Sequence, residues 1–332
     1  MHKGASLAYQ DLQPEDILAA LESAGFRCDG RFLTLNSYEN RVYQVGIEDA
    51  EPVVAKFYRP GRWSDEAILE EHEFACGLAA SEIPVVPPLE VDGTTLLHSG
   101  QFRFSVSPRR GGRAPELDDR EFMKQLGRFV ARIHLYGETE PFRHRPTVDI
   151  ESYGDDSVDY LLDNDFIPLD NVDAYEGVIE HVLDNVEACF ERAGGSRQIR
   201  LHADFHPSNV LVNRDRLHIV DLDDARMGPA VQDLWMFLSG DRDEQEPQLK
   251  ALLDGYEEFR LFDARELHLI EALRSLRIIH YAAWLARRWE DPAFKTAFPW
   301  FNSGRYWDEH VLALREQIAL MQEEPLSWVR GG

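Results

Sequence analysis

The segment from His202 to Asn209 constrains this chain of 332 residues more than any other part of it. It reads His-Ala-Asp-Phe-His-Pro-Ser-Asn, and the strand-like sequence after it ends in Asp221. An Asp, an Asn five residues later and a second Asp beyond a hairpin form the pattern that kinase-type phosphoryl transfer requires. The pattern therefore indicates a reaction as well as a fold.

Each residue of this pattern has a chemical role. Asp204 is expected to orient an acceptor hydroxyl and take its proton. Asn209 and Asp221 offer the hard oxygen ligands that Mg²⁺ prefers, and we expect them to hold the ion against the phosphates of ATP. Taken alone, Asp204 could be the Asx residue of a surface turn, but the three residues together favour catalysis. Asp233, at the start of a later helix, is interpreted as structural support.

A lysine within an apolar strand is a second signal. Lys56 lies in the run Val-Val-Ala-Lys-Phe-Tyr, where a charge is unfavourable unless it is paired. In kinases a lysine of the third strand contacts the α- and β-phosphates and pairs with a helix glutamate. We select Glu71, in a helix predicted over residues 65–80, as the partner. Glu70 and Glu73 are alternatives because the helix phase is open. An exposed edge lysine is the simpler interpretation of Lys56, but the Val-Ala-Lys pattern favours the functional one.

Hydrophobic periodicity divides the chain into a β-rich part and a helix-rich part. The predicted fold class is α+β, a bilobal protein kinase-like fold with a small antiparallel sheet in the N-terminal lobe and a mostly helical C-terminal lobe. The predicted domains are residues 1–107, an ATP-binding lobe, and residues 108–332, a catalytic and acceptor-binding lobe. The predicted N-terminal elements are helices over 14–25 and 65–80 and strands over 32–35, 41–45, 53–58, 94–98 and 101–106.

Charge and composition exclude several classes of function. A net charge of -25 repels a phosphate backbone and an anionic membrane surface. Three scattered cysteines, without a CxxC pair, are typical of reduced cytoplasmic thiols. The sequence has no run of eighteen apolar residues and no signal peptide core. We therefore expect a cytoplasmic protein without nucleic-acid or membrane partners.

A metal-dependent hydrolase is a competing interpretation of the same segment. His202, Asp204 and His206 alternate, and imidazole would suit zinc or iron. No second histidine pair has matching spacing, and Asn209 would have no role. We therefore favour the kinase pattern.

Longer strings of residues resemble the bacterial stress response kinase A family, within the aminoglycoside phosphotransferase and choline kinase superfamily. The superfamily's catalytic segment is similar to the run from His202 to Asn209 followed by Ile219-Val220-Asp221. The strings that resemble the closer family lie at residues 35–43, 56–63, 111–113, 220–226 and 228–235.

This resemblance implies an ATP- and Mg²⁺-dependent serine/threonine protein kinase, cytoplasmic and monomeric, which acts in envelope stress signalling on Ser/Thr acceptors of proteins and on itself. Functional residues carry over by position: Asp204 as catalytic base, Asn209 and Asp221 as magnesium ligands, Lys56 as phosphate lysine and Ser37 as loop serine. The backbone from Phe104 to Val106 matches the hinge that would bind adenine.

The chain also departs from ordinary protein kinases. The usual His-Arg-Asp motif is replaced by His202-Ala203-Asp204, and the usual Asp-Phe-Gly motif is replaced by Asp221-Leu222-Asp223. No Ala-Pro-Glu segment marks an activation loop. The loop over residues 36–40 has no glycine. Two alternatives therefore stay open: a kinase for a small amino alcohol, and a pseudokinase that binds nucleotide without turnover. Detection of a phosphorylated metabolite would identify the small-molecule kinase, and nucleotide binding without turnover would identify the pseudokinase.

Overall fold

A computed structural model describes residue 9, residues 12–214 and residues 216–330. Contacts divide the chain into two compact units. The first unit contains the described residues up to Pro115, together with 142–145 and 208–223. The second unit contains residues 116–141, 146–207 and the described residues from Asp224 onward. Residues 208–223, which were expected in the C-terminal lobe, thus belong to the same unit as the N-terminal sheet.

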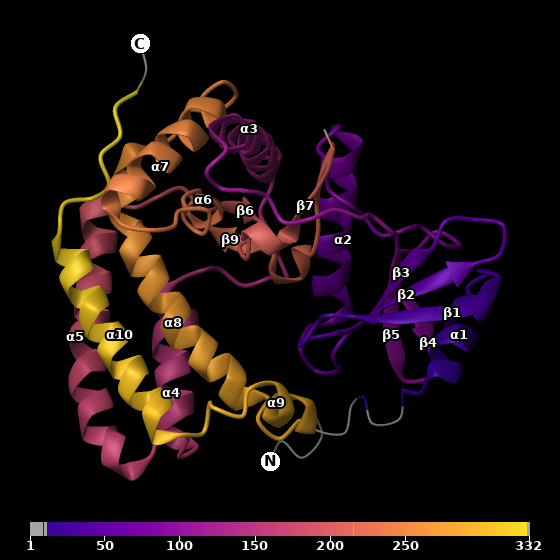
Figure 1. The fold of residues 1–332 in the computed structure, drawn as a ribbon, viewed down its shortest axis with the longest axis horizontal. Coiled ribbons are helices and arrows are strands. Elements are labelled where there is room, and N and C mark those ends of the chain that lie inside the picture. The colour runs from indigo at the N-terminus through magenta and orange to yellow at the C-terminus, as the bar shows by residue number, and fades with distance from the viewer. Residues whose placement is uncertain (1–8, 10–11, 215, 331–332) are drawn as a thin grey trace. The chain divides into compact units, whose positions relative to one another are not determined.

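The first unit is built on a five-stranded antiparallel sheet in the order β1-β2-β3-β5-β4 (Figure 1). Its strands are β1 (Cys28–Leu35), β2 (Arg41–Ile47), β3 (Val53–Phe57), β4 (Leu97–Ser99) and β5 (Phe102–Pro108). Burial alternates along β3: Val53, Ala55 and Phe57 are buried, while Val54 and Lys56 lie on the other face. The register places Lys56 between Val42 of β2 and Ser105 of β5.

Two helices of the first unit belong to this sheet. Helix α1 (Pro14–Ser23) contributes Ile17 and Leu21 to the core that the sheet buries. Helix α2 (Asp65–Ala80) matches the helix predicted over residues 65–80, which is confirmed. It begins where the Ser64 hydroxyl accepts a hydrogen bond from the backbone N–H of Ala67, at 3.2 Å.

The hairpin of β7 (Val210–Asn213) and β8 (Arg216–Ile219) completes the first unit. The backbone of Ile219 donates to the carbonyl of Pro84 and accepts from the N–H of Val86. The short 3-10 turns η2 (Pro207–Asn209) and η3 (Leu222–Asp224) lie at the two ends of the hairpin, where the chain passes from one unit to the other.

The second unit is mainly helical (Figure 1). Its helices are α3 (Arg120–Gly137), η1 (Glu151–Asp155), α4 (Asp156–Asp163), α5 (Leu169–Ala193), α6 (Gln232–Trp235), α7 (Arg242–Tyr256), η4 (Ala264–Leu269), α8 (Ile270–Arg287), α9 (Pro292–Ala297) and α10 (Gly304–Gln322). Strands β6 (Ile199–Leu201) and β9 (Arg226–Gly228) form a short antiparallel pair, and β6 ends immediately before His202. Helix α8 packs against α4, α5 and α10.

Two glycines allow α3 and α7 to cross closely. A Cβ at Gly127 would lie 1.9 Å from the carbonyl oxygen of Leu252, and one at Gly255 would lie 1.9 Å from that of Lys124. No larger residue fits at either position without moving a backbone.

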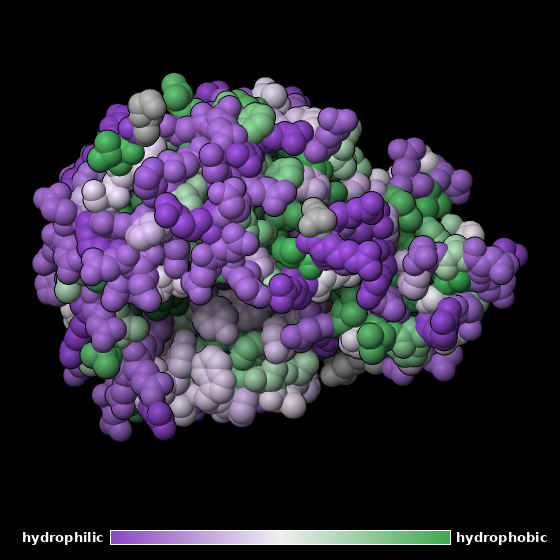
Figure 2. Space-filling model, turned by 45° about the horizontal axis from the view of Figure 1, so that its top comes forward, coloured by the Kyte–Doolittle hydropathy of each residue, from purple (hydrophilic) through white to green (hydrophobic). Residues whose placement is uncertain are grey.

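These elements confirm the predicted fold class, with an antiparallel sheet in the N-terminal part and mostly helices after it. Hydrophilic side chains dominate the face shown in Figure 2. Within the described part of the chain, no helix has both the length and the apolar character needed to span a membrane.

Candidate active site

Lys56 is the cation of an acidic cluster in the first unit. Its Nζ lies 2.8 Å from Oδ1 of Asp221 and 3.8 Å from Oδ1 of Asp223. Burial lowers the pKa of Lys56, but the charges of Asp221, Asp223 and Glu71 outweigh burial and hold that pKa well above its usual value. The side chain therefore keeps its positive charge inside the fold, and the simpler interpretation as an exposed edge lysine is wrong.

Asn209 and Asp221 lie at the base of one hairpin. The carbonyl of Asn209 accepts a hydrogen bond from the N–H of Val220, at 3.0 Å, and this bond brings the two ends together. Asp221 has a φ of 63°, in the left-handed region, which Asp enters more readily than most residues. Its carboxylate is 52% exposed and offers hard oxygens next to Lys56. This donor set, an amide oxygen and a carboxylate, fits Mg²⁺.

Asp223 is tied down from three sides. Its carboxylate contacts Lys56, forms an ion pair with Arg62, and accepts a hydrogen bond from Nδ2 of Asn40 at 3.1 Å. Its backbone carbonyl accepts from Arg145. Three of the family-like strings, at residues 35–43, 56–63 and 220–226, thus meet at the side chain of Asp223.

Glu71 on α2 is a buried carboxylate close to this cluster. Its Oε2 has no hydrogen-bond partner among the described residues. Burial raises the pKa of Glu71 to about 7, against the opposing charge of Lys56. The charge of Glu71 acts on Lys56, but the ion pairs that Lys56 makes within the described residues are to Asp221 and Asp223.

The two alternative glutamates are placed elsewhere. Glu70 accepts hydrogen bonds from the backbone N–H groups of Arg143 and His144, at 2.6 and 2.8 Å. Glu73 is exposed. Of the three candidates, Glu71 is therefore the one whose charge acts on Lys56, and its role as partner of that lysine stays a prediction.

The residues proposed to bind nucleotide occupy different settings. Ser37 lies half-buried in the loop between β1 and β2. Phe104 is paired with β3 on one side and β4 on the other, and the carbonyl of Val106 accepts a hydrogen bond from Leu89 at 2.7 Å. A role of this backbone in adenine binding stays a prediction.

The segment that leads to Asp204 in the second unit is held by a buried carboxylate. Asp233 accepts hydrogen bonds from the backbone N–H groups of His202 and Ala203, at 2.9 and 2.7 Å. Gln232 donates to the carbonyl of Ala203 at 2.7 Å. Ala203 has a φ of 66°, a conformation that is strained for alanine by about 1 kcal/mol or more. Asp233 therefore supports the loop, as the sequence predicts.

Asp204 follows this strained residue and contacts the guanidinium of Arg277 and the ring of His206. Its Oδ1 accepts from Nη1 of Arg277 at 2.6 Å, and its Oδ2 lies 3.5 Å from Nε2 of His206. Burial raises the pKa of Asp204, but the hydrogen bond from His206 and the charge of Arg277 outweigh it and lower the pKa to about 2. Asp204 is thus ionised at neutral pH.

Arg277 is the residue that the sequence did not reveal. It comes from α8, 73 positions after Asp204, and no local motif marks it. His206 entered the sequence analysis only as an alternative metal ligand. The ring of His202 is buried and stacks on Phe205 with centroids 4.8 Å apart, a packing role.

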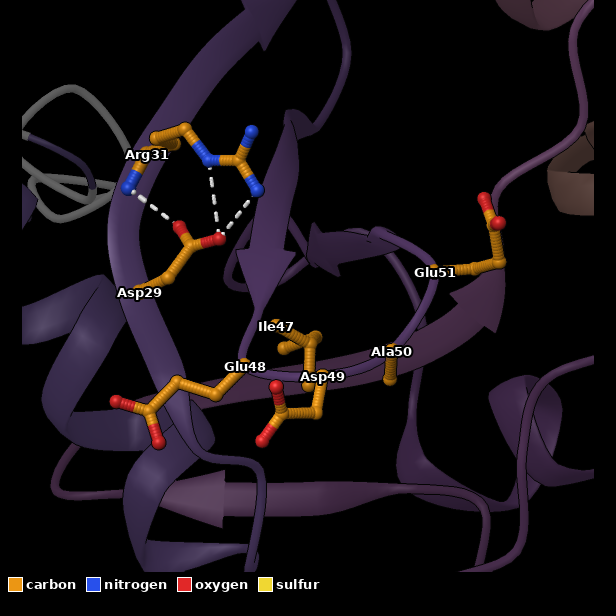
Figure 3. A pocket seen from close by; sticks show the side chains of 7 residues that line it. All are labelled: Asp29, Arg31, Ile47, Glu48, Asp49, Ala50 and Glu51. Atoms are coloured by element: carbon orange, nitrogen blue, oxygen red, sulfur yellow. Dashed lines mark hydrogen bonds and ion pairs between the residues drawn. The ribbon is translucent and has the colours of Figure 1, made fainter.

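A hollow elsewhere in the first unit has a different character (Figure 3). It is lined by residues of β1, the end of β2 and the turn before β3: Asp29, Arg31, Ile47, Glu48, Asp49, Ala50 and Glu51. The guanidinium of Arg31 is held by Asp29 at 2.5 Å, and the remaining charged groups are exposed carboxylates. None of the predicted site residues reaches this hollow.

Comparisons with known proteins identify the family of the chain. The profile of the phosphotransferase enzyme family matches residues 32–270. The chain is 43% identical over 322 residues to stress response kinase A of Escherichia coli (strain K12), with 97% of each chain covered. It is 42% identical over 321 residues to the serine/threonine protein kinase RdoA of Salmonella typhimurium (strain LT2), again with 97% of each covered. A solved amicoumacin kinase shares the fold, with a TM-score of 0.72, 18% identity and 98% coverage of both chains.

Proposed function

The chain belongs to the phosphotransferase enzyme family and, within it, to the stress response kinase A family, and from that premise we propose that it is an ATP- and Mg²⁺-dependent serine/threonine protein kinase of the envelope stress response. The observation that carries the proposal is the Lys56–Asp221 ion pair at the base of the hairpin that also carries Asn209. Kinase activity itself is supported by the family and by relatives that are named kinases.

On the nucleotide side, the first unit supplies charge of both signs. Lys56 would hold the phosphates of ATP, and Asp221 and Asn209 would hold Mg²⁺ through their oxygens. When bound, Mg²⁺ and ATP supply the transferable γ-phosphoryl group and the positive charge that stabilises it. Asp223, fixed by Arg62 and Asn40, would keep Lys56 oriented in the absence of nucleotide.

On the acceptor side, Asp204 is the base. An ionised carboxylate accepts a hydrogen bond from a Ser or Thr hydroxyl and orients its oxygen for attack. With a pKa of about 2, Asp204 is a weak base, so orientation contributes more than early proton removal. This suits phosphoryl transfer, in which positioning supplies most of the catalysis.

Protein rather than small-molecule acceptors are supported by the relative named a serine/threonine protein kinase. A second candidate, a kinase for a small amino alcohol, is favoured by one observation. Burial and the neighbouring charges of Asp159, Glu187 and Asp156 raise the pKa of Asp155, which marks an acidic patch that would attract a cation.

We further propose that the protein is a cytoplasmic monomer that phosphorylates itself as well as partner proteins. The net charge of -25 supports the absence of nucleic-acid and membrane partners.

The test is phosphorylation of an unrelated serine-rich protein by purified chain and Mg-ATP, with phosphosites read by mass spectrometry. We expect phosphoserine or phosphothreonine that disappears with EDTA and in Asp204→Asn. Phosphorylated ethanolamine-type alcohols without phosphoprotein would support the second candidate. Nucleotide binding without any phosphorylated acceptor would contradict both and indicate a pseudokinase.

A further inference from the structure

A concave surface of about 330 Å³ in the first unit is lined by basic side chains. Its lining comes from the end of β5 and from the turn end of the β7–β8 hairpin: Arg109, Arg110, Gly111, Asn213, Arg216 and His218. Asn209 and Asp221 lie at the opposite end of this hairpin. Asn213 follows Asn209 by four residues, so at about 3.3 Å per residue the two ends are roughly 13 Å apart, and the basic pocket is separate from the proposed magnesium ligands.

Glycines let the two segments approach each other. A Cβ at Gly112 would lie 2.8 Å from the backbone carbon of Leu211 and 2.8 Å from the nitrogen of Val212. Arg113 and Val212 exchange backbone hydrogen bonds of 3.0 and 2.8 Å across this contact. The string at residues 111–113, which none of the proposed catalytic roles uses, therefore contributes Gly111 to the lining of the basic pocket and ties that segment to the hairpin through Gly112 and Arg113.

The arginines of this pocket have no acidic partner among the residues that the structure describes, because no carboxylate there lies at ion-pair distance from Arg109, Arg110 or Arg216. Arg109 donates to the amide oxygen of Gln44 at 3.2 Å, and Arg110 donates to the carbonyl of Arg109 at 3.4 Å, both neutral acceptors. Burial and the charges of Arg110 and Arg216 lower the pKa of His218, as expected in a positive field.

This arrangement is unusual for a chain with 60 acidic and 35 basic side chains. In the acidic hollow of Figure 3, the single arginine of the lining, Arg31, is neutralised by Asp29. Acidic side chains are in excess over the whole chain. Among the described residues, however, no acidic side chain lies at ion-pair distance from the three guanidinium groups of the basic pocket. An external anion is therefore a partner that suits these charges.

We propose that the basic pocket binds a phosphorylated serine or threonine side chain of a partner protein. Guanidinium groups form paired, charge-assisted hydrogen bonds with phosphate oxygens, and clustered arginines are a recurrent way to recognise phosphopeptides. The amide of Asn213 adds a neutral donor. The overall negative charge of the protein repels extended polyanions. Salt screens this repulsion between charges more than about 8 Å apart, so a single dianionic group can still bind to the arginines of the pocket at short range.

Binding at this pocket would not require phosphoryl transfer, so it can be tested apart from the proposed kinase activity. Fluorescence anisotropy would use a labelled Gly/Ser peptide with one phosphoserine, and versions with Ser or Glu in its place, without nucleotide. We expect saturable binding of the phosphopeptide and at least tenfold weaker binding of the Ser and Glu peptides. Arg110→Gln and Arg216→Gln should each weaken phosphopeptide binding about tenfold.

Arg315→Gln is the matched control, because it removes one exposed arginine from α10 in the second unit. It should leave phosphopeptide affinity unchanged. The proposal is overturned if no saturable binding is seen up to millimolar peptide, or if the Glu peptide binds equally well. It is also overturned if Arg315→Gln has the same effect as the pocket variants, or if Mg-ATP displaces the peptide, since the pocket would then belong to the nucleotide site.

Discussion

The buried carboxylate of Glu71 and the partly buried carboxylate of Asp204 have pKa values shifted in opposite directions. Burial raises the pKa of Glu71 in the first unit to about 7, whereas Arg277 and His206 overcome burial and lower the pKa of Asp204 in the second unit to about 2. The first cluster has several carboxylates around Lys56, whereas the second places the guanidinium of Arg277 and the ring of His206 against one carboxylate. The difference indicates that the first cluster suits a cationic ligand, while the second keeps a carboxylate ionised, as its proposed role toward an acceptor hydroxyl requires.

The largest expected effect is a loss of phosphoryl transfer after a substitution in the first cluster. Asp221→Asn removes the anionic ligand proposed for Mg²⁺ and the closest partner of Lys56, so phosphoryl transfer should fall on the order of 10³-fold. The initial rate of phosphoprotein formation at saturating Mg-ATP measures this loss. Asp49→Asn is the control, since Asp49 is an exposed aspartate of the same unit with a similar φ of 57°. Equal rates for the two variants would contradict the assigned role.

The second-largest expected effect comes from removing the carboxylate that supports the loop before Asp204 in the second unit. Asp233→Ala leaves the backbone N–H groups of His202 and Ala203 without their acceptor, at an expected loss of about 3 kcal/mol in the free energy of unfolding. Urea denaturation measures it. Asp263→Ala removes a more exposed helix-cap acceptor and should lose only about 1 kcal/mol. Similar losses in both variants would show that Asp233 does not brace the loop.

A pH series separates Glu71 from ordinary glutamates. Because its pKa is raised in the fold, the unfolded chain releases this proton first, and stability is lost as the pH rises from about 4.5 to about 7. Glu71→Gln should remove on the order of 2 kcal/mol of this loss between pH 4.5 and 8. Unfolding free energies at both pH values give the slope, and the exposed Glu73→Gln should keep the wild-type slope. An unchanged slope in Glu71→Gln would contradict the raised pKa.

The smallest expected effect concerns Arg277. Arg277→Gln removes a charge that lowers the pKa of Asp204, so that pKa should rise by about one unit and the acid limb of kcat/KM should move to higher pH. Activity at neutral pH should fall by less than about tenfold, because Asp204 stays ionised there. Arg274→Gln, one helical turn away and paired with Glu271, should leave the acid limb in place. A shift in both variants would point to a general charge effect.

Much of this site is predictable because its signals are local. The spacing of Asp204, Asn209 and Asp221 spans one hairpin. The charge of Lys56 within the apolar strand β3 is unfavourable unless an anion pairs with it, so the sequence alone indicates such a partner. The antiparallel sheet follows from period-two patterns and the helices from longer periods.

Other features depend on distant partners and leave no local trace. Arg277 reaches Asp204 from α8, and Asn40 and Arg62 meet at Asp223 only after the chain folds.

The most direct test of the division of roles between the two clusters compares nucleotide affinity and turnover in Lys56→Met and Asp204→Asn, with Lys250→Met as a surface control in α7. Calorimetry with Mg²⁺ and a non-hydrolysable ATP analogue should show that Asp204→Asn binds like the wild type although it transfers no phosphate. Lys56→Met should lose at least tenfold in affinity. If Asp204→Asn lost nucleotide binding while Lys56→Met kept it, the division of roles between the two clusters would be wrong.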